Sequence, residues 1–142
     1  MTAPPDFLQK CYDGDIENID SYDINMHQYT EGALIALSEN KINVLEKLLD
    51  KIKLDDNKLL IKAVETSNIE AVKILTTAQT NLFYPNDFIN PLIIAIEEDS
   101  FIIFEHFLNF LSDPDHAILF NVIVQLNYFE YVAYLLSRTD FS

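Results

Sequence analysis

The sequence predicts an all-α protein in which short helix pairs stack into a row. Three observations favour this class. Apolar residues recur at helical spacing through most of the 142 residues, the apolar–polar alternation typical of strands is never kept for long, and one pattern recurs five times. Because an isolated helix pair cannot cover its own apolar face, we expect the five units to pack side by side within one domain.

The repeated pattern places a small polar residue between two helical stretches. It spans residues 7–19, 32–49, 59–75, 91–108 and 119–136. The small polar residues are, in chain order, Gly14, Asn40, Ser67, Asp99 and Asn127. We expect each to adopt a left-handed backbone conformation that ends one helix and lets the next begin, since Gly, Asn and Asp tolerate that conformation best. Serine fits this rule least well.

Local signals predict where the helices begin and where the units end. Asn90-Pro91 is typical of an N-cap followed by proline at the first helical position. Ser67-x-x-Glu70 and Asn127-x-x-Glu130 are similar to capping boxes. Turn-forming runs at 55–57, 84–87 and 112–115 separate the units. We therefore expect a single domain over 1–142, with repeats at approximately 5–28, 29–56, 57–86, 87–114 and 115–142 and about two helices in each.

The pattern within these units resembles the ankyrin repeat. Its best matches are Ala36 followed by the run 40–49, and the run 60–75. A third match, Asn90-Pro91-Leu92-Ile93-Ile94-Ala95, is similar to the Thr-Pro-Leu-His-x-Ala opening of that family. The resemblance implies an ankyrin-like α-solenoid of about five degenerate helix-turn-helix repeats that works by binding protein. A solenoid built from another kind of helix pair is the alternative.

The sequence departs from the ankyrin pattern in two ways. No unit has the second glycine that the family places after its second helix. Lys10 and Ile123 stand where the first and last units would have a small alanine. We therefore expect the loops between units to be short or irregular.

Charge and composition exclude several classes of protein. Nine Lys plus Arg against 23 Asp plus Glu give a net charge of −14, and Arg138 is the only arginine, which argues against direct nucleic-acid binding. A single cysteine, Cys11, excludes an internal disulfide and indicates a reducing compartment. The most apolar stretch, 101–111, contains Glu105, His106 and Asn109, so no membrane span is predicted. We expect a cytoplasmic protein.

The residues that could carry catalysis or hold a metal are scattered. Cys11 and the histidines His27, His106 and His116 lie in different units, so no nucleophile–base pair is predicted. Asp13-x-Asp15-x-Glu17 lacks the glycine and the second glutamate of a calcium loop, and two glycines cannot make a phosphate-binding loop. We expect no enzyme activity, no cofactor and no metal.

A column of acidic residues is the candidate binding site. The resemblance implies that the two residues before each small polar residue face the partner on a concave surface. These residues are Tyr12, Asp13, Ser38, Glu39, Glu65, Thr66, Glu97, Glu98, Gln125 and Leu126. At least one acid occupies the column in each of the first four units, so their fields would add along one groove and attract a basic protein partner. Such a chain could mask a basic surface, as an inhibitor or immunity protein does.

Other functions and surfaces stay open on sequence alone. An acidic mimic of nucleic acid, which blocks a DNA- or RNA-binding protein, is one alternative, and an ankyrin adaptor effector of a pathogen or virus is another. Tyr128, Tyr131 and Tyr134 recur every three residues in the final unit. They either finish the surface with hydroxyls in water or form the interface of a homodimer. Phe101, Phe104 and Phe107 are expected in the core.

Overall fold

A computed structural model describes residues 7–15, 24–52, 56–77 and 80–138. In these ranges helices alternate with turns and loops and no strand is present, which confirms the all-α prediction. The helices found there are α1 (Phe7–Asp13), α2 (Met26–Ser38), α3 (Ile42–Leu49), α4 (Lys58–Glu65), α5 (Ile69–Leu75), α6 (Pro91–Glu97), α7 (Phe101–Leu108), α8 (Asp113–Gln125) and α9 (Phe129–Ser137). The second helix predicted for the first unit, ending at Ile19, lies outside the described residues.

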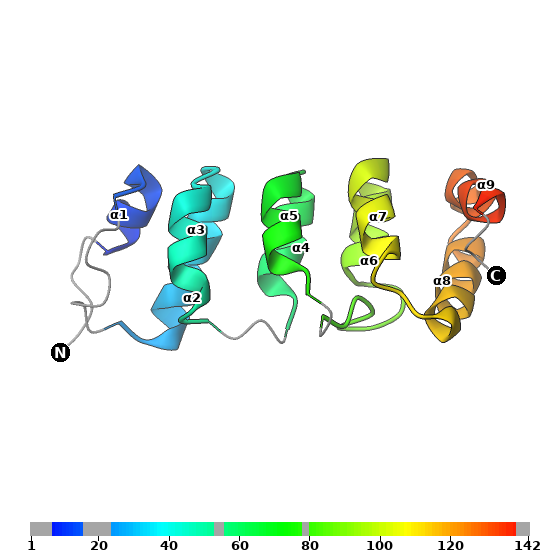
Figure 1. The fold of residues 1–142 in the computed structure, drawn as a ribbon, viewed down its shortest axis with the longest axis horizontal. Helices are drawn as coiled ribbons and strands as arrows, with labels where there is room; N and C mark the ends of the chain where they lie inside the picture. The colour runs from blue at the N-terminus through cyan, green and yellow to red at the C-terminus, as the bar shows by residue number, and fades with distance from the viewer. Residues whose placement is uncertain (1–6, 16–23, 53–55, 78–79, 139–142) are drawn as a thin grey trace.

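The helices form successive antiparallel pairs along a row, with α1 at one end and the pair of α8 and α9 at the other (Figure 1). Two layers follow from the contacts: α1, α2, α4 and α6 pack in sequence in one layer, and α3, α5 and α7 in the second. Helix α2 begins at Met26 and α8 at Asp113. The predicted unit boundaries 28/29 and 114/115 therefore fall inside helices.

Each small polar residue of the repeated pattern adopts the predicted left-handed conformation. The φ angles are 82° at Gly14, 56° at Asn40, 56° at Ser67, 54° at Asp99 and 63° at Asn127. The serine thus behaves like the other members of the set, because the hydrogen bonds of the turn impose the conformation that its side chain does not favour.

One pair of backbone hydrogen bonds closes all of these turns. Around Asn40, the Lys41 N–H donates to the Ala36 carbonyl at 2.7 Å and the Asn40 N–H donates to the Leu37 carbonyl at 3.2 Å. The same two bonds recur at Gly14, Ser67, Asp99 and Asn127. This arrangement is the Schellman motif, which satisfies carbonyls that a helix end leaves unpaired. After Asn40, Ser67, Asp99 and Asn127 the next helix therefore starts two residues later, antiparallel to the first.

The predicted helix starts are confirmed at α6 and wrong at α5 and α9. The Asn90 side chain accepts a hydrogen bond from the Ile93 N–H at 3.0 Å, with Pro91 at the first helical position. Helix α5 is capped by Asn68, not Ser67, and α9 has no side-chain cap. The reason is that Ser67 and Asn127 are already the left-handed residues of the preceding turns. True capping boxes start the longest helices: Asn25 with Gln28 at α2, and Ser112 with Asp115 at α8.

The core lies between the layers and contains Phe104 and Phe107, both fully buried as predicted, whereas Phe101 is 39% exposed. At the first end of the row, α1 packs closely on α2. A Cβ added at Gly32 would lie 2.8 Å from the Cys11 Sγ and 3.1 Å from the Phe7 Cε2, so only glycine fits there without a shift. Among the described residues, every helix is too short or too polar to cross a lipid bilayer.

Candidate partner-binding surface

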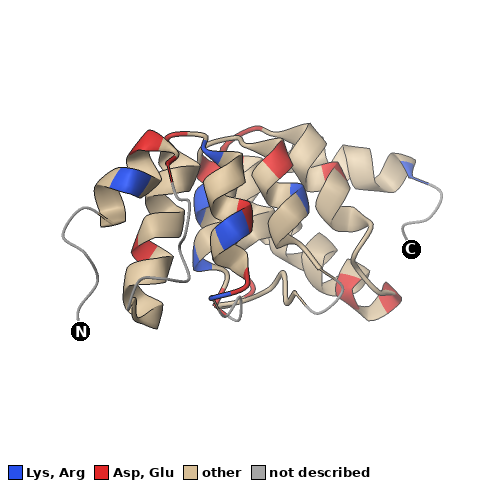
Figure 2. Ribbon diagram, turned by 60° about the vertical axis from the view of Figure 1, so that its left-hand side comes forward, with Lys and Arg blue, Asp and Glu red and all other residues tan. Residues whose placement is uncertain are grey.

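The predicted site residues all lie at the C-terminal ends of the first helices of the pairs. Tyr12 and Asp13 end α1, and in each later unit the first residue ends the helix and the second is its C-cap. We call this set the turn edge; it comprises Tyr12, Asp13, Ser38, Glu39, Glu65, Thr66, Glu97, Glu98, Gln125 and Leu126. All of them are exposed except Leu126, which is half-buried. Acidic ribbon recurs along this edge of the row (Figure 2).

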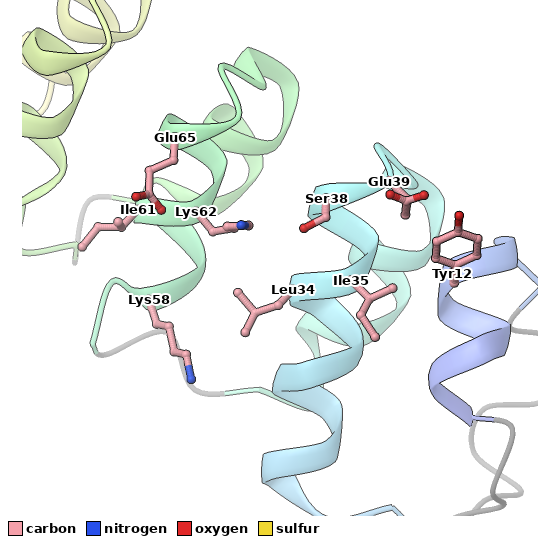
Figure 3. Close-up of a pocket in the computed structure, with 9 residues that line it drawn as sticks. All are labelled: Tyr12, Leu34, Ile35, Ser38, Glu39, Lys58, Ile61, Lys62 and Glu65. Atoms are coloured by element: carbon pink, nitrogen blue, oxygen red, sulfur yellow. The ribbon is translucent and has the colours of Figure 1, made fainter.

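Helices α1, α2 and α4 form an open pocket of about 630 Å³ beside the turn edge (Figure 3). Its apolar floor is made by Leu34 and Ile35 of α2 and by Ile61 of α4. Four turn-edge residues also line the pocket, namely Tyr12, Ser38, Glu39 and Glu65. The structure therefore brings together site residues that are 53 positions apart in the sequence, from 12 to 65.

Glu39 interacts with the neighbouring tyrosine, Tyr12. Its negative charge is the main cause that raises the pKa of Tyr12, and a hydrogen bond between the two side chains and the partial burial of the phenol add to the shift. This bond uses one lone pair of the Glu39 carboxylate, so its other lone pairs can accept hydrogen bonds from a partner.

Two lysines line the same pocket, and the sequence reasoning missed them. Lys58 and Lys62 stand four residues apart on α4, so they share a helix face. In Figure 3 Lys58 lies at the end of the pocket opposite Glu39, and the Lys62 amine extends toward α2. The pocket therefore carries both signs of charge: Lys62 reaches toward α2 near the turn-edge carboxylates, and Lys58 lies at the far end. The i, i+4 spacing was a visible signal, but only the packing of α2 beside α4 gives it meaning.

The remaining turn-edge residues lie outside this pocket. Glu97 and Glu98 end α6. A second cavity of about 470 Å³ between the last two pairs is lined by Ile96, Asp99, Asn127, Tyr128, Phe129, Glu130 and Tyr131, and so by none of the predicted site residues. Burial raises the pKa of Tyr128, which lines this cavity, and the charge of Glu97 adds to the shift. Gln125 and Leu126 are not brought to either cavity.

The structure corrects the prediction for the tyrosines of α9. Tyr131 is only 3% exposed, and its ring stacks on Phe101 with centroids 4.3 Å apart. Its hydroxyl donates to Asp99 Oδ1 at 3.3 Å, and the Tyr134 hydroxyl donates to Glu105 Oε2 at 2.5 Å. Burial, with Asp99 beside it, raises the pKa of Tyr131 to about 12. These tyrosines dock α9 on α7, so Tyr131 is neither in water nor available to a second copy.

The chemical groups weighed in the sequence are placed as follows. Cys11 is fully buried, and burial raises the pKa of its thiol to about 11, so the thiol is neutral and shielded. In the part of the chain that the structure describes, no three His, Cys, Asp or Glu side chains gather closely enough to hold a metal ion. The acids Asp113 and Asp115 occupy the first turn of α8, where the positive end of the helix dipole favours them.

Comparison with protein-family models, curated proteins and solved structures finds no match for this chain. The resemblance to ankyrin repeats therefore stays a prediction, carried by the repeated left-handed turn and by the residues in register with it.

Proposed function

We propose that the chain is a divergent ankyrin-like solenoid that binds a basic protein partner through the turn edge and the adjacent pocket, without catalysis. The observation that carries this proposal is the position of the acids. Asp13, Glu39, Glu65, Glu97 and Glu98 all lie at helix C-termini. The partial negative charge of a helix C-terminus favours cations, so these acids oppose the stability of their own helices.

The placement of these acids lowers the stability of the fold, and that cost is an argument for a function. Each acid at a helix C-terminus costs about 0.3–1 kcal/mol at an exposed site. Helices α2 and α6 have no basic residue in their last turn to offset that cost. Helices α1 and α4 carry Lys10 and Lys62 in their last turns, so the uncompensated cost falls on two of the units, and such a cost is expected where function requires it. The acids and the helix dipoles together give the edge a negative potential that would speed encounter with a positive partner.

The pocket defines the partner segment further. Its apolar floor suits one or two apolar side chains, and its carboxylate end suits Lys or Arg. The opposite end, with Lys58, suits an acidic side chain. We therefore expect a segment with basic residues along the turn edge, an apolar anchor in the pocket and an acid toward Lys58. By binding such a segment, this chain would mask the basic surface of its partner, as an inhibitor or immunity protein does.

A peptide-display selection against the whole chain tests this proposal. We expect selected peptides to be enriched in Lys and Arg, and their affinity to fall with rising salt. The variant Glu39→Gln/Glu65→Gln/Glu97→Gln/Glu98→Gln should bind them at least about fourfold more weakly, at roughly 0.2–1 kcal/mol for each of the four exposed charge pairs lost.

The matched control removes the same number of negative charges away from the turn edge, either on α3 or at the opposite ends of the helix pairs. It replaces Glu46, Asp50, Asp87 and Asp113 by Gln or Asn, all of which are exposed. We expect its affinity to stay within about threefold of the parent chain, because separated surface charges are screened within about 10 Å at 0.1 M salt. Selected peptides without basic enrichment, or an equal loss in both variants, would contradict the proposal.

A further inference from the structure

The last helix pair has an outer face that nothing in the described chain covers. On α8, Ala117, Asn121 and Val124 are exposed at i, i+4 and i+7, opposite the buried Leu119 and Ile123. On α9 the same spacing exposes a second stripe, Phe129, Ala133 and Leu136, opposite the buried Tyr131 and Leu135. We call these six residues the terminal face. All six belong to α8 and α9, the helix pair at one end of the row (Figure 1).

Comparison of equivalent positions in successive helix pairs shows which contact the terminal face lacks. Phe101 stands two residues after the left-handed Asp99; the Tyr131 ring of the next pair stacks on it and leaves it 39% exposed. Phe129 holds the same position after Asn127 in the last pair, and it is 64% exposed. Leu136, on the same stripe, is 69% exposed. These are apolar side chains at positions where a further pair would pack.

The absence of charge on the terminal face indicates which molecule binds there. None of the six terminal-face residues is charged, in a chain with a net charge of −14. Glu130, the nearest acid on α9, instead lines the cavity with Asp99 on the inner side of the pair. Two copies of this chain repel each other over most of their surfaces, and an uncharged apolar face is where that repulsion is least and the apolar gain greatest.

We propose that the terminal face binds the terminal face of a second copy, giving a closed dimer joined end to end. A two-fold axis places the same apolar patch on both sides, so the contact is self-complementary and stops at two chains. Six side chains are few compared with the 20–30 residues per side of a stable complex, so we expect a weak dimer with a Kd on the order of 100 µM. This inference does not depend on the proposed function.

Sedimentation velocity from about 5 to about 500 µM, on either side of that Kd, tests the dimer without any partner protein. The parent chain should shift from monomer toward dimer, and more strongly at high salt, because screening removes repulsion between the chains. Binding at the turn edge should instead weaken with salt, so the two proposals fail separately. Small-angle scattering of the dimer should show a maximum dimension close to twice that of the monomer.

Two variants with the same charge change complete the test. Phe129→Glu should raise the dimer Kd at least about tenfold, because each dimer buries that side chain twice and gains two unpaired charges. Ile102→Glu, at an α7 residue 73% exposed and outside the terminal face, should leave the Kd within about threefold, as expected for a distant site. A monomer at every concentration and salt, a dimer insensitive to Phe129→Glu, or growth beyond two chains would overturn the proposal.

Discussion

Neutralising the acids at the end of α6 should make the protein more stable and its binding weaker. Glu97 is the last residue of α6 and Glu98 is its C-cap, and no basic residue lies in that last turn. The Glu98 N–H already donates to the Ile94 carbonyl, so glutamine at these positions keeps the backbone bonds. Each removed charge relieves about 0.3–1 kcal/mol of unfavourable interaction with the helix dipole. The double variant Glu97→Gln/Glu98→Gln should therefore gain about 1 kcal/mol.

The assay is urea unfolding at low salt, followed by circular dichroism, with thermal unfolding as a second readout. A gain of about 1 kcal/mol corresponds to a rise in Tm of roughly 2–4 °C for a domain of about this size. The gain should shrink at high salt, because the dipole interaction of exposed groups is screened.

The matched control removes two acids from the opposite ends of helices. Glu70 and Asp113 lie in the first turns of α5 and α8, where the helix dipole favours negative charge. The variant Glu70→Gln/Asp113→Asn should be no more stable than the parent chain, although its net charge changes equally. If both variants gained the same stability, the overall charge of −14 would explain the effect, and the reasoning from helix ends would be refuted.

Three further predictions test the interior and the turns. Gly32→Ala should lower stability by about 1–3 kcal/mol, because the added methyl would lie 2.8 Å from the Cys11 Sγ, and Cys11→Ala in the same chain should recover part of the loss in a double-mutant cycle. Ser67→Gly should raise the free energy of unfolding by up to about 1 kcal/mol, because φ is 56° there, and a decrease would contradict the assigned conformation. The pKa of Cys11 rises from 9.0 to about 11 on folding. The contribution of its neutral thiol to the free energy of unfolding is therefore fully present below pH 9 and is lost as pH rises from 9 toward 11, because the unfolded chain gives up the proton first. The parent chain should therefore lose up to about 2–3 kcal/mol over that window relative to Cys11→Ala, measured by urea unfolding, and equal pH dependence of the two chains would contradict the buried neutral thiol.

The turns were predictable because their requirement is local. A left-handed residue between two helices restricts the backbone so strongly that Gly, Asn and Asp stand out in the sequence. The two capping predictions at Ser67 and Asn127 were wrong for a related reason. Both residues fit the sequence pattern of a capping box, but each is already the left-handed residue of the preceding turn. A single residue cannot be both the left-handed turn residue and an extended N-cap.

The remaining parts of the site depend on packing between units, which the sequence pattern does not contain. Lys58 and Lys62 matter only because α4 lies beside α2, so that they share a pocket with Glu39. The three-residue period of the tyrosines was visible, but which side of α9 meets α7 depends on how the last pair is placed on the one before it. The exposed stripe of Phe129 and Leu136 follows from that same placement.

The most direct test of the acidic turn edge is an NMR titration of the isotope-labelled chain with a Lys/Arg-rich peptide. We expect amide shifts to change mainly near Asp13, Glu39, Glu65 and Glu98, together with residues of the pocket such as Ile35, and these changes to diminish at high salt. Changes centred instead on the opposite edge, near Asp50, Asp87 and Asp113, or spread evenly over all acidic residues, would contradict it.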